Sequence, residues 1–184
     1  SDHPDLARWL ADNNTPLTRL IEASRRPHYF HPLVSARESH EMRLLGAHSG
    51  VSKSRRWSEA MICRAMCQIA DGRLDSAWDD LQACQRLGGL MASRSATILA
   101  MVTGLALMEN ACRAQSLLLN QKGLTAEQLR AWTLDSRKGY SVPSLAAKCD
   151  LGERLVMLDS LQSIAMSDWK QNGLLVAIDY NQAL

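Results

Sequence analysis

The stretch SEAMICRAMCQIADGRLDSAWDDLQACQRL, residues 58–87, decides the fold class of this chain. On both sides of Asp71-Gly72, apolar residues recur every three or four positions, which is the spacing that puts them on one face of a helix. A glycine between two such patterns is typical of a turn. The stretch therefore predicts two amphipathic helices folded back on each other, a helical hairpin over about residues 55–88.

The composition of the whole chain also favours an all-α protein. Leu, Ala and Met, which favour helices, are abundant, whereas the chain has one Phe and three Tyr. Its 184 residues are enough for one domain with a sizeable core. The 21 basic and 19 acidic residues give a net charge of +2, a balance too even to predict binding to nucleic acid or to an anionic membrane.

Start and stop signals along the chain predict about eight helices. One helix is expected over residues 35–48, ending at Ser49-Gly50, and the second helix of the hairpin is expected to end at Gly88-Gly89. Thr125 and Gln128 have the spacing of a capping box. Because the expected connections are short, neighbouring helices should be antiparallel. The prediction is an irregular bundle of about eight antiparallel helices, forming a single domain over residues 1–184.

Both ends of the sequence lack the signals expected of a complete helical protein. The chain starts at Ser1 without a Met, and it ends at Leu184 without a helix stop, so we expect it to be part of a longer protein. The longest uncharged run, Ser95–Met108, is shorter than the roughly 20 residues that a membrane-spanning helix needs. We therefore expect no membrane span in this chain.

The hairpin resembles a single tetratricopeptide repeat. Its small and packing residues stand where such a repeat places them: Ala65, Gly72, Leu74, Ala77, Leu81 and Cys84. The unit does not recur at the period of 34 residues that these repeats follow, since Ala106 then takes the place of Gly72. The resemblance implies one repeat-like unit inside an irregular bundle.

A wider resemblance covers most of the chain. The segments HPDLARWL (residues 3–10), RPHY (26–29) and DLGER (150–154), together with the hairpin, are similar to a bacterial family of uncharacterised, largely helical proteins. The resemblance implies that these segments belong to the interior of a longer protein. It implies no particular activity.

The first candidate site is formed by Asp150, Glu153 and Arg154. Arg154 falls within a helical stripe of four leucines, at positions 151, 155, 158 and 161, and Asp150 stands one turn before it. One interpretation is a structural ion pair that ties this helix to its neighbours, with Gly152 letting another backbone come close. The other is a ligand site in which the planar Arg154 fork binds a small anion and Glu153 or Asp150 orients it.

The second candidate is an anion patch of Lys53, Arg55 and Arg56. These cations are expected near a helix start capped by Ser52 or Ser54, where free amides and the helix dipole favour a phosphate. The alternative is an ordinary solvated charge cluster.

The cysteines and histidines do not predict a metal site. Cys63 and Cys67 are four residues apart on one helix and Cys84 lies on its partner, but the sequence has no CxxC pair and no evident fourth ligand. Buried thiols acting as small apolar residues are the better interpretation. His28 and His31 form a two-residue pattern in a Pro-bounded loop, which is also too few ligands for a structural metal.

Three function hypotheses follow from these residues. The sequence has no GxSxG, HExxH or Gly-rich phosphate loop, so it predicts no catalytic residue and no cofactor. The first hypothesis is a non-enzymatic helical scaffold or protein-interaction domain, whose partner is another protein or another domain of the same chain. The second is a module that binds a small anion at Asp150 and Arg154, or a metal at the cysteines. The third is an enzyme with an unfamiliar acid–base site. A shallow face with exposed Leu and Met favours the first, and a deep polar pocket around Arg154 favours the second.

Overall fold

The computed structural model describes residues 3–30, 49–136 and 139–166, and within these ranges the chain is helical with no strand. The helices are α1 (Pro4–Asp12), α2 (Asn14–Ser24), α3 (Ser49–Ala70), α4 (Leu74–Arg94), α5 (Ile98–Leu119), α6 (Ala126–Ser136), α7 (Leu145–Lys148), the π-helix η2 (Cys149–Glu153) and α8 (Arg154–Met166). Because α7, η2 and α8 follow one another without a break, the described residues form seven separate helices rather than about eight. The helix expected over residues 35–48 lies outside the described ranges. The all-α prediction is confirmed.

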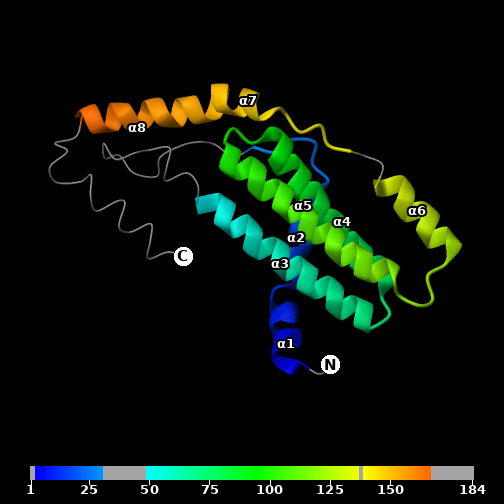
Figure 1. Cartoon of the computed structure of the whole chain (residues 1–184). Helices are drawn as coiled ribbons and strands as arrows, with labels where there is room; N and C mark the ends of the chain where they lie inside the picture. Colours follow the sequence, from blue (N-terminus) through cyan, green and yellow to red (C-terminus); the bar gives the residue numbers. More distant parts are fainter. Residues whose placement is uncertain (1–2, 31–48, 137–138, 167–184) are drawn as a thin grey trace.

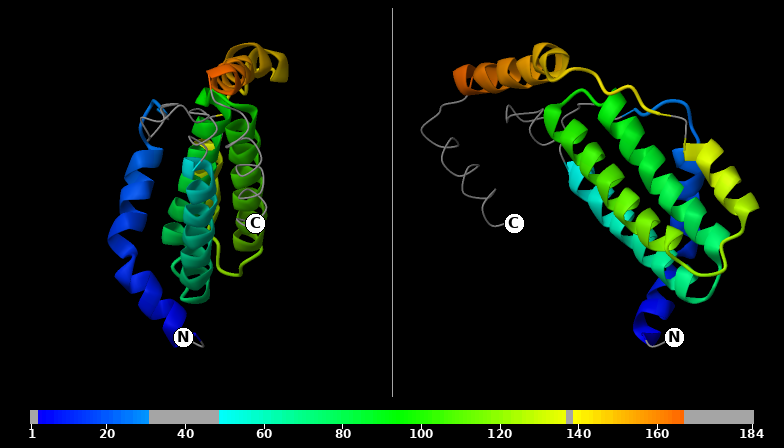
Figure 2. Two further views of the ribbon diagram at one scale, coloured as in Figure 1. Left: turned by 90° about the vertical axis from the view of Figure 1, so that its left-hand side faces the viewer. Right: turned by 45° about the vertical axis from the view of Figure 1, so that its right-hand side comes forward.

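Helices α3, α4 and α5 lie side by side and form the centre of the molecule, with α1 and α2 against one side (Figures 1 and 2). The hairpin predicted around Gly72 is the α3–α4 pair, and Gly72 makes the turn with a φ of 74°. Ala65, Ala77 and Leu81 are completely buried between these helices. The spacing of the apolar residues thus identified the helices that carry the core.

Two of the expected helix boundaries are wrong. Helix α3 begins at Ser49, so Gly50 lies in its first turn, and α4 continues through Gly88 to Arg94. The expected end at Gly88 is wrong because Gly88 packs against α5: a Cβ added to Gly88 would lie 2.6 Å from the carbonyl oxygen of Gly104. The glycine lets the two helices approach closely, so it serves packing here rather than a helix end.

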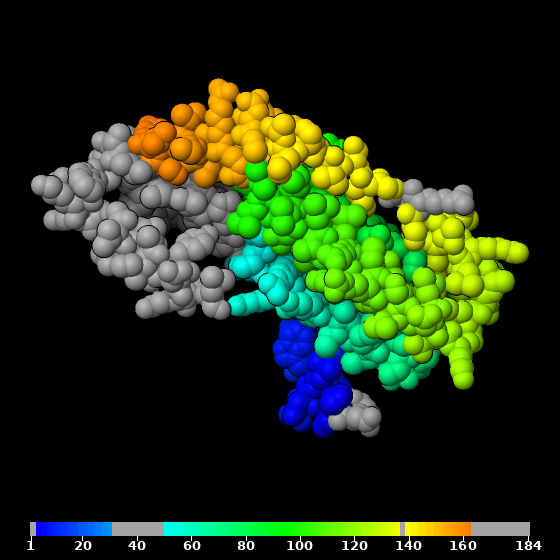
Figure 3. Space-filling model, viewed as in Figure 1, coloured from blue at the N-terminus to red at the C-terminus, as the bar shows by residue number. Residues whose placement is uncertain are grey.

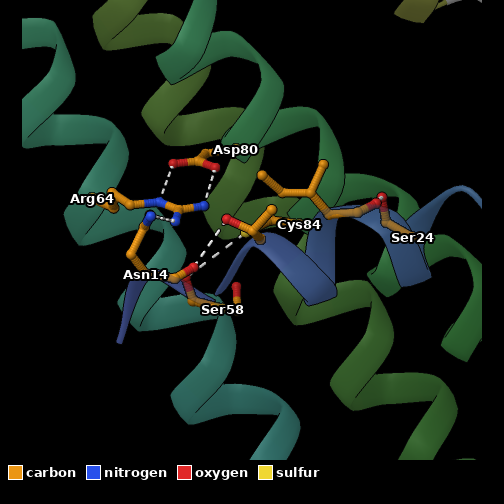
Figure 4. Close-up of polar contacts among 8 residues, drawn as sticks. Asn14, Ser24, Ser58, Arg64, Asp80 and Cys84 are labelled. Carbon is orange, nitrogen blue, oxygen red and sulfur yellow. Dashed lines mark hydrogen bonds and ion pairs between the residues drawn. The ribbon is translucent and has the colours of Figure 1, made fainter. Parts of the chain in front are cut away.

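A buried ion pair links the first helices to the hairpin (Figure 4). Arg64 of α3 donates to both carboxylate oxygens of Asp80 in α4, at 2.8 and 2.7 Å, and to the side-chain oxygen of Asn14 in α2 at 3.0 Å. The Asp80 side chain is only 1% exposed. Burial raises the pKa of Asp80, and the Arg64 guanidinium partly opposes that rise. The planar guanidinium of Arg64 thus donates two hydrogen bonds to one carboxylate, a geometry that makes such an ion pair specific.

Helix α6 packs along α4 in the same direction. Three contacts join the two helices in order: Gln128 with Asp75 at 3.1 Å, the Trp132 ring stacked on Trp78 at 4.7 Å, and Ser136 with Gln82 at 3.1 Å. Residue numbers rise together in both helices, so the pair is parallel. The expectation of antiparallel neighbours applies to helices that follow one another in the chain, and it holds here: α5 is antiparallel to α4, and α6 is antiparallel to α5 (Figure 1).

The segment after α6 continues along the same helix. Tyr140 lies over Gly89 of α4, where an added Cβ would overlap the tyrosine ring. Residues 128–153, where described, therefore run alongside α4 from its first turn to its last, and we call this segment the strap. The end of the strap, formed by α7 and η2, lies where α4 gives way to α5, and α8 continues from there (Figures 1 and 2).

Candidate functional site

Lys148 fixes the end of the strap to the end of α4. Its ammonium group donates to the carbonyl oxygen of Ser95, and it also lies 3.5 Å from the carbonyl oxygen of Ser93. These carbonyls stand at the negative end of the helix, where a cation is favourable. Lys148 is buried, and this burial lowers its pKa. Its role is to cap α4.

Glu153 caps the N-terminal end of the next helix, α5, whereas Lys148 caps the C-terminal end of α4. Its carboxylate accepts a 2.7 Å hydrogen bond from the backbone amide of Ile98, the first residue of α5. Acidic groups are favourable at this positive helix end. Between the two caps, Gly152 packs against the backbone of Ala96, and a Cβ at that position would overlap the Ala96 carbonyl. The predicted close approach at Gly152 is therefore confirmed.

The π-turn of η2 makes both caps possible. In this turn the amide of Arg154 donates to the carbonyl of Cys149, five residues earlier. One extra residue per turn brings positions that are five apart, such as Lys148 and Glu153, to the same side of the helix. We call Lys148, Gly152 and Glu153 the clamp. It holds the helix in one rotational setting about its axis.

The clamp turns the leucines of this helix towards solvent. On the inner side Gly152 and Val156 are buried, whereas on the outer side Leu151, Leu155, Leu158 and Leu161 are 69%, 56%, 52% and 52% exposed. We call these four residues the leucine face. Met157 beside them is 63% exposed. Helix α8, which carries most of this face, lies along one edge of the molecule (Figure 3).

Arg154 and Asp150 lie within this outer side. Their side chains are 69% and 71% exposed, and the Arg154 guanidinium lies 3.3 Å from the Asp150 carboxylate. The two residues therefore pair as predicted, but the pair lies within one helix and in contact with solvent, so it does not tie this helix to its neighbours. Glu153 points to α5 instead, so the structure brings together two of the three predicted ligand residues. Anion binding by this group stays a prediction.

The anion patch differs from its expected setting. Lys53, Arg55 and Arg56 are all exposed, and Arg55 lies 3.1 Å from Glu59 one turn later. Because α3 begins at Ser49, the three cations follow the first turn and do not surround the helix start. Phosphate binding by these residues stays a prediction, without the support of free helix amides.

Cys84 fits the prediction of buried thiols, but Cys112 and Cys149 are exposed, so for these two the prediction is wrong. Cys84 is buried with its sulfur 3.8 Å from the carbonyl of Ser58, and burial raises the pKa of the Cys84 thiol to about 12. Cys63 and Cys67 are half-buried. Within the described ranges, no three His, Cys, Asp or Glu side chains are grouped as metal ligands. His28 is exposed, and His31 lies outside those ranges.

Exposed apolar residues also occur on α5, among them Leu99 and Val102, and on α6. Leu129 and Leu134, which are 40% and 65% exposed, line an open hollow with Arg130 and Thr133. Helix α6, which carries this hollow, lies at the opposite end of the molecule from α8 (Figure 1). Among the helices of the described ranges, none is long and apolar enough to cross a membrane.

These geometries define a helical bundle with an apolar face held at one edge. Comparison of the chain with protein families, with curated proteins and with solved structures gives no match. The resemblances to a tetratricopeptide repeat and to a bacterial helical family therefore stay predictions. The function has to be argued from the site itself.

Proposed function

We propose that this protein is a non-enzymatic helical scaffold that binds a protein partner through the leucine face. The observation that carries the proposal is the exposure of four leucines, each more than half exposed, on one side of one helix. Soluble proteins rarely leave such residues together on the surface unless the surface binds something.

The clamp strengthens this proposal, because it gives the exposed leucines a structural cause. Lys148, Gly152 and Glu153 contact three consecutive parts of the α4–α5 connection, at Ser95, Ala96 and Ile98. A rotation that buried the leucines would break both caps and drive Glu153 into solvent. The orientation of the leucine face is thus fixed by contacts on the opposite side of the helix.

Arg154 adds a polar element that suits a protein interface. Arginine is enriched among the residues that dominate binding energy, and an interface commonly combines an apolar centre with a few charged groups. The Asp150 carboxylate holds the guanidinium in place before binding, which lowers the ordering cost on association.

A site-specific cross-linking experiment tests the proposal. Leu158 is replaced by a photoreactive phenylalanine analogue and the protein is irradiated in its native cells. Leu134 on α6, which is 65% exposed against 52% for Leu158, receives the same change as the control. We expect one discrete adduct at position 158 that is absent at position 134. The purified adduct partner should then bind the wild-type protein and lose binding on Leu155→Glu. Equal, diffuse labelling at both positions, or no labelling at either, would refute an interaction function for this face.

A further inference from the structure

We infer that Cys63 and Cys67 form a binding site for a single copper(I) ion, held between their two sulfur atoms. The site lies on α3, and it does not depend on the leucine face. The third thiol of the hairpin, Cys84, takes no part because it is buried on α4 with its sulfur 3.8 Å from the carbonyl of Ser58.

The two thiols lie on the same side of α3, one helical turn apart. Residues four apart in an α-helix have their Cβ atoms about 5–6 Å from each other. A metal–sulfur bond is about 2.3 Å long, so an ion midway between two sulfurs needs them about 4.6 Å apart. Rotation of the two side chains covers this difference. The Cys63 and Cys67 pair can therefore hold one ion without a movement of the backbone.

The surroundings of the pair combine an apolar floor with access from solvent. Cys67 packs against an apolar cluster that includes Leu10 of α1 and Leu17 of α2. Both thiols are only half-buried. An ion can therefore reach the sulfurs from solvent, while the apolar cluster keeps water from one side of the site.

The charges around the pair favour a cation between the sulfurs. Burial and, next, a charge on Cys63 raise the pKa of the Cys67 thiol; Asp71 adds to this rise and Arg73 opposes it. Two neighbouring thiolates repel each other, and a cation between them removes that repulsion. On binding, each thiol loses its proton, so two thiols and one Cu⁺ give a dithiolate complex with one negative charge and release two protons.

The number and kind of ligands select the metal. Thiolates are soft ligands, which suit copper(I), zinc and iron–sulfur clusters. Structural zinc takes four ligands, and iron–sulfur clusters are usually held by four cysteines. Across residues 3–30, 49–136 and 139–166, no group of three or more His, Cys, Asp and Glu side chains is placed to hold a metal. Copper(I) is the ion among these that is stable with two thiolates alone.

An anaerobic competition with the copper(I) chelator bicinchoninate tests the inference on the full 184-residue chain. The wild type should withdraw one Cu⁺ per chain from the coloured chelator complex. Cys63→Ser and Cys67→Ser should each weaken binding by more than about 100-fold, the most that is lost when a residue merely supports a metal ligand. Cys112→Ser, which changes an exposed thiol on α5, is the matched control and should bind like the wild type. A wild type that leaves the copper with the chelator, or a Cys63→Ser variant that binds normally, overturns the inference.

Two further measurements separate this site from other ways of binding copper. X-ray absorption of the copper-loaded wild type should show two sulfur neighbours, and a third sulfur or a nitrogen neighbour would overturn the inference. Sedimentation should give the same mass with and without copper, because both sulfurs belong to one chain; a copper-dependent doubling of the mass would mean that the ion joins two chains. The cross-link at position 158 should persist in Cys63→Ser, so the copper site and the proposed interaction function can fail separately.

Discussion

Gly152→Ala should release the end of the strap from the bundle. The added methyl group overlaps the carbonyl of Ala96, a backbone atom that cannot rotate away, so the helix has to move off the α4–α5 connection. That movement breaks the charged hydrogen bonds of Lys148 to Ser95 and of Glu153 to Ile98. Each such bond stabilises a fold by about 1.5–3 kcal/mol, and replacing glycine by alanine in a helix returns about 1 kcal/mol.

The net effect is a loss of roughly 2–5 kcal/mol from the docked state of the strap. Because α3, α4 and α5 keep their contacts, the loss should be local. Hydrogen exchange measures it directly: the Ile98 amide, which donates to Glu153, should exchange about 30- to 5,000-fold faster in Gly152→Ala, the ratio that corresponds to such a loss. Urea unfolding followed by circular dichroism should show the strap separating from the bundle at a lower urea concentration than in the wild type.

Gly139→Ala is the matched control, since nothing lies within 4 Å of a Cβ at that position and its φ is not positive. It should leave the Ile98 amide as protected as in the wild type. Equal protection in Gly152→Ala and Gly139→Ala would refute the clamp as the device that orients the leucine face.

Three further outcomes follow from the contacts around α4. Arg64→Met should lower the free energy of unfolding by about 3–5 kcal/mol, measured by urea denaturation, because it leaves the Asp80 carboxylate buried without its partner; a loss below 1 kcal/mol would contradict a buried pair. Burial raises the pKa of Asp80 above 3.8, so ionisation of this carboxyl destabilises the folded state. The free energy of unfolding of the wild type, relative to that of Asp80→Asn, should be highest below pH 3.8 and fall as the pH rises through the raised pKa. A difference that does not change with pH would be evidence against that shift. Trp132→Ala should cost about 3–5 kcal/mol and change the fluorescence of Trp78, on which the ring stacks; unchanged emission would mean that α6 does not dock as described.

Local features of the fold could be predicted because their causes are local. The hairpin follows from residue periodicity and the turn at Gly72, and the capping box is present, since the Gln128 amide donates to Thr125 and the Thr125 amide donates to Gln128. The pairing of Asp150 with Arg154 likewise needs only their spacing on one helix.

Features that depend on distant residues could not be predicted. A glycine at position 88 is compatible both with a helix end and with close packing against another helix. Which of the two occurs depends on Gly104, sixteen residues away. Periodicity shows that four leucines share a face, but it does not show which way the face points. That direction is set by Lys148 and Glu153, whose partners lie about fifty residues earlier in the chain.

The strap also has a consequence for the order of folding. The α3–α4 and α4–α5 pairs join segments that are adjacent in the chain, so they can form as soon as α5 has been synthesised. The strap can add only afterwards, because it needs the completed length of α4 as its template. The leucine face that the clamp presents is therefore the last part of this assembly to exist. Until the α4–α5 connection exists, no contact of the clamp fixes the direction in which these leucines point.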